Sequence, residues 1–126
     1  MIQGVIDTNV LVEVARGNAK AIAWLQTQSD LAITTINWLE FMQGAPGKTG
    51  QARAISIMTP FQLVTLTDND QQWSMQQMAR YRLSNGVELK DTLIASVAYR
   101  LQVPMYTQNV KDFVPLLGTA QVIKPY

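Results

Sequence analysis

The segment MIQGVIDTNVLVEVARG, residues 1–17, is the stretch from which we derive the fold. Residues 2–6, which end in the apolar pair Val5 and Ile6, are typical of a short buried strand, and Asp7 follows that strand directly. A helical pattern of apolar residues comes next and ends near Gly17, a residue suited to a helix C-terminus. We therefore expect the carboxylate of Asp7 at the carboxyl end of a strand, where open α/β sheets bind their ligands.

Strand and helix patterns alternate along the rest of the chain. The expected strands are residues 2–6, 31–33, 61–66, 103–106 and 121–123. The expected helices run from Asp7 to near Gly17, over residues 19–28, 36–43, 48–59 and 90–101, and from an N-cap at Asp70 through Leu83. This alternation favours a three-layer α/β/α fold with a parallel sheet and right-handed crossovers, in a single domain of residues 1–126.

The composition excludes several kinds of chemistry. Without any His, the chain has no Ser-His-Asp triad, no two-histidine ribonuclease mechanism and none of the common zinc sites. Without any Cys, it has no disulfide framework and no thiolate nucleophile, which suits a reducing compartment, and we expect a cytoplasmic protein. Catalysis would have to depend on carboxylates, Lys, Tyr, hydroxyl groups or a metal-bound water, and ligand sets made only of oxygen favour Mg²⁺ or Mn²⁺.

The bulk charge and hydropathy give no sign of a membrane or nucleic-acid partner. The formal net charge is +1, so any surface for RNA must be local or depend on bound metal. No apolar run approaches the roughly 20 residues of a membrane span. The N-terminus also lacks a basic leader followed by an apolar core, so we expect neither a signal peptide nor a membrane segment.

Oxygen-bearing side chains recur where strands end or helices begin. They are Asp7, Glu40, Asp91 and the pair Asn109 and Asp112. Each has an ordinary structural alternative: a helix cap, a solvated helix charge, a partner of the helix dipole, or a turn residue. Together they would meet at one edge of the sheet, and neighbouring carboxylates repel unless a cation lies between them. The combination therefore predicts a divalent metal site, in which Thr8 and Asn9 could hold the Asp7 carboxylate in one rotamer.

Four segments, in order, resemble the PIN-domain ribonucleases, and most of all the VapC toxins of bacterial toxin–antitoxin pairs. They are IDTNVLVEVARG, ITTINWLEFMQG, GVELKDTLIASVA and YTQNVKDF, and the resemblance covers essentially the whole chain. Asp7, Glu40 and Asp91 match the three core acidic positions, Asn109 stands where the family has Asp or Asn, and Asp112 is the acidic residue before Phe113. Thr8, Asn9 and Thr107 match the accompanying hydroxyl and amide positions.

This resemblance implies a five-stranded parallel sheet of order 3-2-1-4-5 and metal-dependent hydrolysis of RNA phosphodiester bonds. Asp7 and Asp91 would bind Mg²⁺, or Mn²⁺ in its place, directly, and Glu40, Asn109 and Asp112 would bind it directly or through water. One of the carboxylates of Asp7, Glu40, Asp91 and Asp112 would take the proton of the attacking water. The residues Thr8, Asn9 and Thr107 would support these ligands.

The resemblance also implies partners: a cognate antitoxin whose tail fills a groove near the active site, and a second copy in a homodimer. Candidates for the groove or the dimer face are Trp24, Trp38, Met42, Met58 and Phe61, several of which could instead belong to the core. Basic residues that could rim an RNA cleft are Arg16, Lys20, Lys48, Arg53, Lys90 and Lys111.

Two alternatives remain open at this point. The neutral amide of Asn109 gives the site one charge fewer than Asp would, which favours a catalytically weak PIN-like module that binds RNA or a protein without cutting. In the other alternative the chain is a doubly wound domain whose acidic residues only cap helices.

Overall fold

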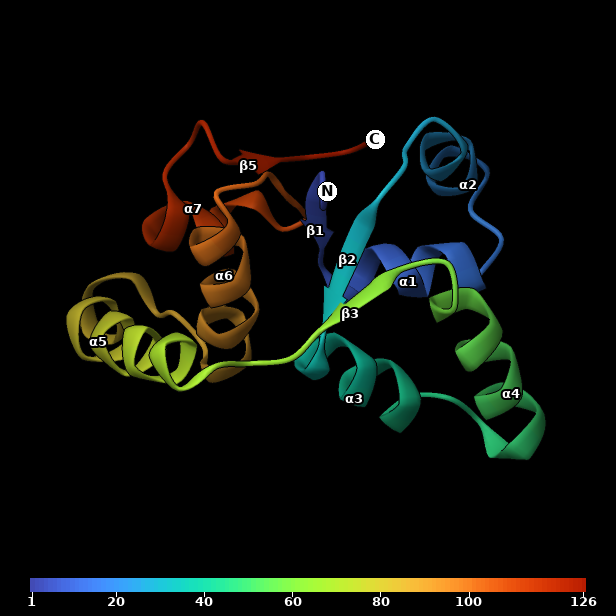
Figure 1. Cartoon of the computed structure of the whole chain (residues 1–126), viewed down its shortest axis with the longest axis horizontal. Helices are drawn as coiled ribbons and strands as arrows, with labels where there is room; N and C mark the ends of the chain where they lie inside the picture. Colours follow the sequence, from blue (N-terminus) through green and yellow to red (C-terminus); the bar gives the residue numbers. More distant parts are fainter.

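The computed structural model describes residues 1–126. It contains a five-stranded sheet in the order β3-β2-β1-β4-β5, in which every pair of neighbouring strands is parallel (Figure 1). The strands are β1 (Gly4–Ile6), β2 (Leu31–Thr34), β3 (Gln62–Val64), β4 (Met105–Tyr106) and β5 (Val122–Ile123). The helices are α1 (Thr8–Ala15), α2 (Ala19–Gln26), α3 (Thr35–Gln43), α4 (Gly47–Met58), α5 (Asp68–Asn85), α6 (Leu89–Leu101) and α7 (Val110–Leu117). The expected fold class and strand order are confirmed. None of the helices combines the length and hydropathy needed to cross a bilayer.

The central strand β1 divides the core into two clusters because successive side chains of a strand point to opposite faces. Val5 packs with buried residues of α6 and α7, and Ile6 packs with buried residues of α1, α3 and α4. Both side chains are fully buried. Figure 1 accordingly shows α5, α6 and α7 on one side of the sheet and α1 to α4 on the other. A strand covered on both faces needs an apolar run rather than an alternating one, as residues 4–6 have.

Strand pairing places polar residues side by side at the carboxyl edge. Ile6 of β1 lies opposite Tyr106 of β4, and the amide of Asp7 donates to the Tyr106 carbonyl at 2.9 Å. The next residues of the two chains, Asp7 and Thr107, are therefore neighbours. Helix α6 buries four apolar residues against the same core, Ile94, Ala95, Val97 and Ala98. This packing holds the first turn of α6, which carries Asp91, at the same edge of the sheet.

The structure differs from the expected elements most at β3, α5 and α7, and β1 and β4 are each two residues shorter than expected. Strand β3 spans Gln62–Val64 rather than residues 61–66, because it is an outer strand and Gln62 and Leu63 are exposed. Residues 110–117 form the whole helix α7, where the sequence predicts a turn or at most a first helical turn. The burial of Phe113 and Leu116 against the core stabilises this helix despite Pro115 within it.

The expected N-cap at Asp70 is also wrong. The N-cap of α5 is Thr67, whose hydroxyl accepts from the Asp70 amide at 3.0 Å, and the Asp70 carboxylate accepts from the Thr67 amide at 3.0 Å. This reciprocal capping box places the N-cap three residues earlier than expected, and the helix begins at Asp68. The Asp70 carboxylate is only 2% exposed and also forms a two-point ion pair with Arg100 of α6, at 2.9 and 3.0 Å. The pair joins α5 to α6.

The ion pair of Asp70 and Arg100 should stabilise the fold at neutral pH. Burial alone would raise the pKa of Asp70, but the hydrogen bonds from Arg100 and Thr67 and the guanidinium charge hold that pKa below its ordinary value of 3.8. Arg100→Gln should lower the free energy of unfolding at neutral pH by about 2 kcal/mol, since the buried carboxylate loses its charged partner while the arginine was partly exposed. Urea unfolding measures this loss.

The pH dependence has a defined sign. A carboxylate with a lowered folded-state pKa stabilises the fold above about pH 4, and this contribution is lost as the pH falls through the folded-state value. The stabilities of the wild type and Arg100→Gln should therefore converge in strong acid. Lys124→Gln, at an exposed position with no ion pair, is the matched control and should unfold like the wild type. An equal deficit of Arg100→Gln at every pH would contradict this account.

Candidate active site

The carboxylate of Asp7 is held at both oxygens. Its Oδ1 accepts from the Thr8 amide at 2.8 Å, so Asp7 is the N-cap of α1. Its Oδ2 accepts from the Thr107 hydroxyl at 2.8 Å, across the β1–β4 pairing. The Thr107 hydroxyl in turn accepts from the Asn109 amide at 3.0 Å. Asp7 thus caps a helix, as the structural alternative requires, and is also fixed in position at the sheet edge by a second strand.

Glu40 is joined to the same place by a chain of hydrogen bonds. Its Oε1 accepts from the Thr8 hydroxyl at 2.7 Å, and the Thr8 hydroxyl accepts from the Asn37 side-chain amide at 3.0 Å. Asn37 is fully buried and also accepts from the Thr34 hydroxyl at 2.9 Å and the Thr34 amide at 2.8 Å. The sequence reasoning missed Asn37. The spacing Thr34-x-x-Asn37, a capping box at the start of α3, was the available signal.

Lys90 is the cation nearest to these carboxylates. Its Nζ lies 3.5 Å from Glu40 Oε2, and its side chain is 52% exposed. The charges of Glu40, then of Asp91 and Glu88, raise the pKa of Lys90 despite some loss of hydration. Lys90 is therefore charged at every physiological pH and partly balances the acidic group.

Asp91 carries the largest electrostatic cost in the group. It is 7% exposed, and no side chain or backbone group donates a hydrogen bond to its carboxylate. Burial, followed by the negative charges of Asp7 and Asp112, raises the pKa of Asp91 to about 7. Burial also raises the pKa of Asp7, although the hydrogen bonds from Thr107 and Thr8 oppose this. The fold therefore brings negative charges closer together than its own groups can compensate.

These residues line one cavity of about 390 Å³. Its walls are Asp7, Thr8, Asn9, Val12, Glu40, Glu88, Lys90, Asp91, Asn109 and Asp112, and we call it the acidic cavity. Seven of the eight site residues expected from the sequence line it, and the eighth, Thr107, is buried behind Asp7. The sequence reasoning missed Glu88, which is the N-cap residue of α6 and lies three positions before Asp91.

The donor chemistry of the acidic cavity fits a hard divalent cation. Every candidate ligand is an oxygen, and the buried Oδ1 of Asn9 has no hydrogen-bond partner. As the side chains stand, no three carboxylates are arranged to enclose one ion. Oxygens of Asp7 and Glu40 instead contact Thr107, Thr8 and Lys90. Closing a ligand sphere would need rotation of these side chains within the cavity.

A second cavity of about 350 Å³ lies beside the acidic one, between α1, α3 and α4. The two share Val12 and Glu40 as wall residues, and the second is also lined by Arg16 and Arg53. Of the six basic residues expected to rim an RNA cleft, Arg16, Arg53 and Lys90 line one of these two cavities. Lys20, Lys48 and Lys111 line neither.

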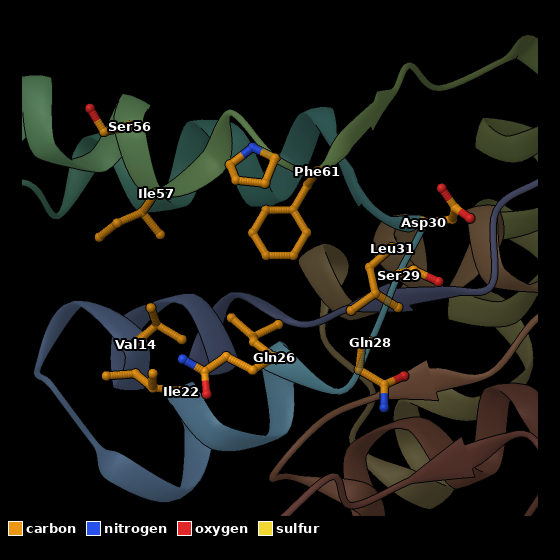
Figure 2. A pocket seen from close by; sticks show the side chains of 12 residues that line it. Val14, Ile22, Gln26, Gln28, Ser29, Asp30, Leu31, Ser56, Ile57 and Phe61 are labelled. Atoms are coloured by element: carbon orange, nitrogen blue, oxygen red, sulfur yellow. The ribbon is translucent and has the colours of Figure 1, made fainter.

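A third cavity, of about 380 Å³, is mostly apolar and lies between α4 and the α1–α2 pair. Figure 2 shows Phe61 and Ile57 pointing from the α4 side toward Val14 and Ile22. Phe61, which was expected at a partner surface, lines this cavity and is half-buried, and it also packs against the core. Met58, expected in the same role, is 4% exposed and belongs to the core. The other residues expected there, Trp24, Trp38 and Met42, are half-buried and pack against the same core cluster.

Comparisons with known proteins agree with this fold. The family model described as the PIN domain matches residues 4–111. A toxin–antitoxin complex from Klebsiella pneumoniae contains a chain that is 26% identical, with a TM-score of 0.77 and 98% of each chain covered. Two further structures share the fold over 98% of each chain. They are FitAcB from Neisseria gonorrhoeae (22% identity, TM-score 0.78) and VapBC2 from Rickettsia felis bound to a DNA fragment from its promoter (18%, 0.80). No curated protein matches the chain.

The crowded carboxylates generate a second stability prediction. The folded-state pKa of Asp91, about 7, is above its ordinary value of 3.8, so the metal-free protein should lose stability as the pH rises between these values. Asp91→Asn should remove this loss and raise the melting temperature in EDTA at pH 8 by about 3 °C or more. Below pH 4 the two proteins should melt alike.

The matched control for this measurement is Asp68→Asn, an exposed acid in the first turn of α5. Its loss should cost a few tenths of a kcal/mol through the helix dipole, with no stabilisation at pH 8. A melting temperature of Asp91→Asn that follows the wild type from pH 4 to pH 8 would show that Asp91 is not under electrostatic strain.

Proposed function

The chain belongs to the PIN-domain family, and from this membership we propose that it is a metal-dependent endoribonuclease, the toxin of a VapBC-type toxin–antitoxin pair. PIN domains are generally nucleases, which supports a hydrolase. The observation that carries the proposal is the acidic cavity, in which Asp7, Glu40, Asp91 and Asp112 meet with Lys90 as the only cation in the wall. We further propose that residues 1–126 act as one cytoplasmic PIN-like domain.

The proposed cofactor is Mg²⁺, which Mn²⁺ could replace. Asp7 and Asp91 would bind it directly, and Glu40, Asn109 and Asp112 directly or through water. When bound, the ion would supply a water of lowered pKa and would neutralise charge that develops on the phosphoryl group. Thr107 and Thr8 would hold the Asp7 carboxylate in one orientation through the hydrogen bonds already described.

The proton of the attacking water needs an acceptor that is not a histidine. The acidic residues of the cavity, Asp7, Glu40, Asp91 and Asp112, are the available bases, and all of them line the same space. Glu40 is positioned for this role by Thr8, which donates to one of its oxygens while Lys90 faces the other. Asn9, the remaining supporting residue, lines the cavity and approaches the Thr107 hydroxyl at 3.5 Å.

A second candidate function rests on Asn109. Its neutral side chain occupies a position in the cavity wall where Asp would add a further carboxylate, and Asp112 is the only acid in the first turn of α7. With a weaker metal site, the chain would be a PIN-like module that binds RNA or a protein without cutting it. Metal-induced stabilisation without cleavage of any RNA would favour this alternative.

Cleavage of RNA tests the proposed enzyme. In MgCl₂ the chain should cut single-stranded or transfer RNA, and Asp7→Asn should reduce the rate at least 100-fold, because one ligand charge is lost. Asn retains the helix cap, so folding should survive the substitution. Gel analysis of end-labelled RNA measures the rate, and the matched control Asp68→Asn should cut normally. Cleavage that persists in excess EDTA would refute a metal-dependent mechanism.

An antitoxin partner follows from the relatives, which were solved as toxin–antitoxin complexes. We propose that the antitoxin binds the apolar cavity between α4 and the α1–α2 pair (Figure 2). Exposed apolar clefts on small proteins commonly mark partner sites. The proposed homodimer would use another surface, the groove between α5 and α6, where Met75 and Leu89 are 72% and 68% exposed.

Ile22 gives a test of the antitoxin surface, because it lines this cavity and is 36% exposed. Ile22→Lys should abolish co-purification with the small protein encoded by the neighbouring reading frame, since a charge would be buried in an apolar contact. Its melting temperature should stay close to that of the wild type. The control is Leu83→Lys, at a fully exposed position of α5. Equal capture by both variants would place the antitoxin elsewhere.

A further inference from the structure

The second cavity, between α1, α3 and α4, has the opposite charge character from the acidic cavity beside it. Apart from the shared Glu40, its only charged wall residues are Arg16 and Arg53. The remaining walls are small or apolar, with Val12 and Phe41 on one side and Ala54 and Ile57 on the other. A cavity of about 350 Å³ lies within the usual range of small-ligand sites. We call it the arginine cavity.

The two arginines are available to a ligand. Arg53 forms no ion pair and no side-chain hydrogen bond in the structure. Arg16 is paired only with Glu13, at 3.3 Å, and its side chain is 71% exposed. An exposed pair of this kind contributes less than about 1 kcal/mol, so an anion could take its place. Arginine is also the side chain best suited to grip a phosphate at two points.

The arginine cavity is also the neighbour that a polymeric substrate would enter. It shares Val12 and Glu40 with the acidic cavity. Neither the cavity between α4 and the α1–α2 pair nor the groove between α5 and α6 shares any residue with the acidic cavity. An RNA strand that is cut internally must continue on at least one side of the cut bond. The carboxylates that surround the cut would repel its phosphates, so the continuing strand needs cations on its flank.

We propose that the arginine cavity is a subsite for the nucleotide next to the cleaved bond, where Arg53 and Arg16 bind its phosphate and the apolar wall contacts its sugar or base. This assignment rests on the proposed nuclease function and adds to it the direction in which single-stranded RNA leaves the acidic cavity. An acidic protein segment could also bind the same two arginines, but nothing would require it to extend to Glu40, where the arginine cavity meets the acidic cavity. RNA is therefore the occupant that the geometry favours.

Binding of a short fluorescein-labelled single-stranded RNA, measured by fluorescence anisotropy in MgCl₂, tests the subsite. Every protein carries Asp7→Asn so that the RNA is not cut. Adding Arg53→Gln should weaken binding roughly tenfold, the loss of one charged hydrogen-bonded contact. It should also reduce the slope of the logarithm of the binding constant against the logarithm of the salt concentration by about 0.7, the value expected for the loss of one phosphate contact with a single strand. Arg16→Gln together with Arg53→Gln should weaken binding further.

The matched control is Lys20→Gln, which removes an equal charge from an exposed residue that lines neither cavity. It should leave the affinity nearly unchanged. If the arginine variants bind RNA as tightly as their parent, the subsite is wrong even if the enzyme cuts RNA. If they bind RNA normally but lose a polyglutamate peptide, the cavity takes acidic protein segments and the proposal is likewise wrong.

A small substrate separates the subsite from the nuclease proposal. Bis(p-nitrophenyl) phosphate is a diester without a flanking nucleotide. Arg53→Gln in the otherwise unmodified protein should therefore lose a much larger share of kcat/KM for RNA than for this diester, mainly through a raised KM. RNA binding that depends on Arg53, in a chain that hydrolyses neither RNA nor the small diester, would retain the RNA contact but refute the nuclease, and with it the role of the cavity beside a cleaved bond. Equal loss of both activities in Arg53→Gln would instead make Arg53 part of the catalytic group and overturn the subsite.

Discussion

The hydrogen bond from the Thr107 hydroxyl to Asp7 is the contact on which the site depends. It joins the ends of β1 and β4, so the central pair of the sheet and the orientation of the first carboxylate are determined together. The other oxygen of Asp7 caps α1, and α1 carries the Thr8 hydroxyl that positions Glu40. One carboxylate thus couples the sheet, the first helix and the acidic cavity, and the local folding of this edge also assembles its chemistry.

At this edge of the sheet, negatively charged side chains outnumber positively charged ones. Five carboxylates line the acidic cavity and Lys90 is its only basic side chain. The fold tolerates this because the apolar packing of α6 and β1 holds the backbone in place, while burial and repulsion raise the pKa of Asp91. Lys90 stabilises the group without filling it, since its ammonium faces Glu40 alone. A cation that binds only the folded state would relieve the remaining repulsion and so stabilise the protein.

Much of the fold and most of the candidate site could be predicted from the sequence, because both are encoded locally. A buried strand followed at once by an acid, as at Asp7, needs no long-range information. Helix α7 could not be predicted, because its stability comes from Phe113 packing on a core assembled from distant strands. Asn37 was missed for a similar reason: its side chain matters through Thr8, which is far away in the chain and close in the fold.

The short outer strand β3 has a consequence for how copies of this chain meet. A sheet edge offers unpaired backbone groups to any other strand, and long apolar edges of this kind promote aggregation. Here the edge is only three residues long, and it begins with the exposed amide side chain of Gln62. An added strand would gain too few backbone hydrogen bonds to hold it in register. The β3 edge is therefore poorly suited to pairing with a strand of a second copy.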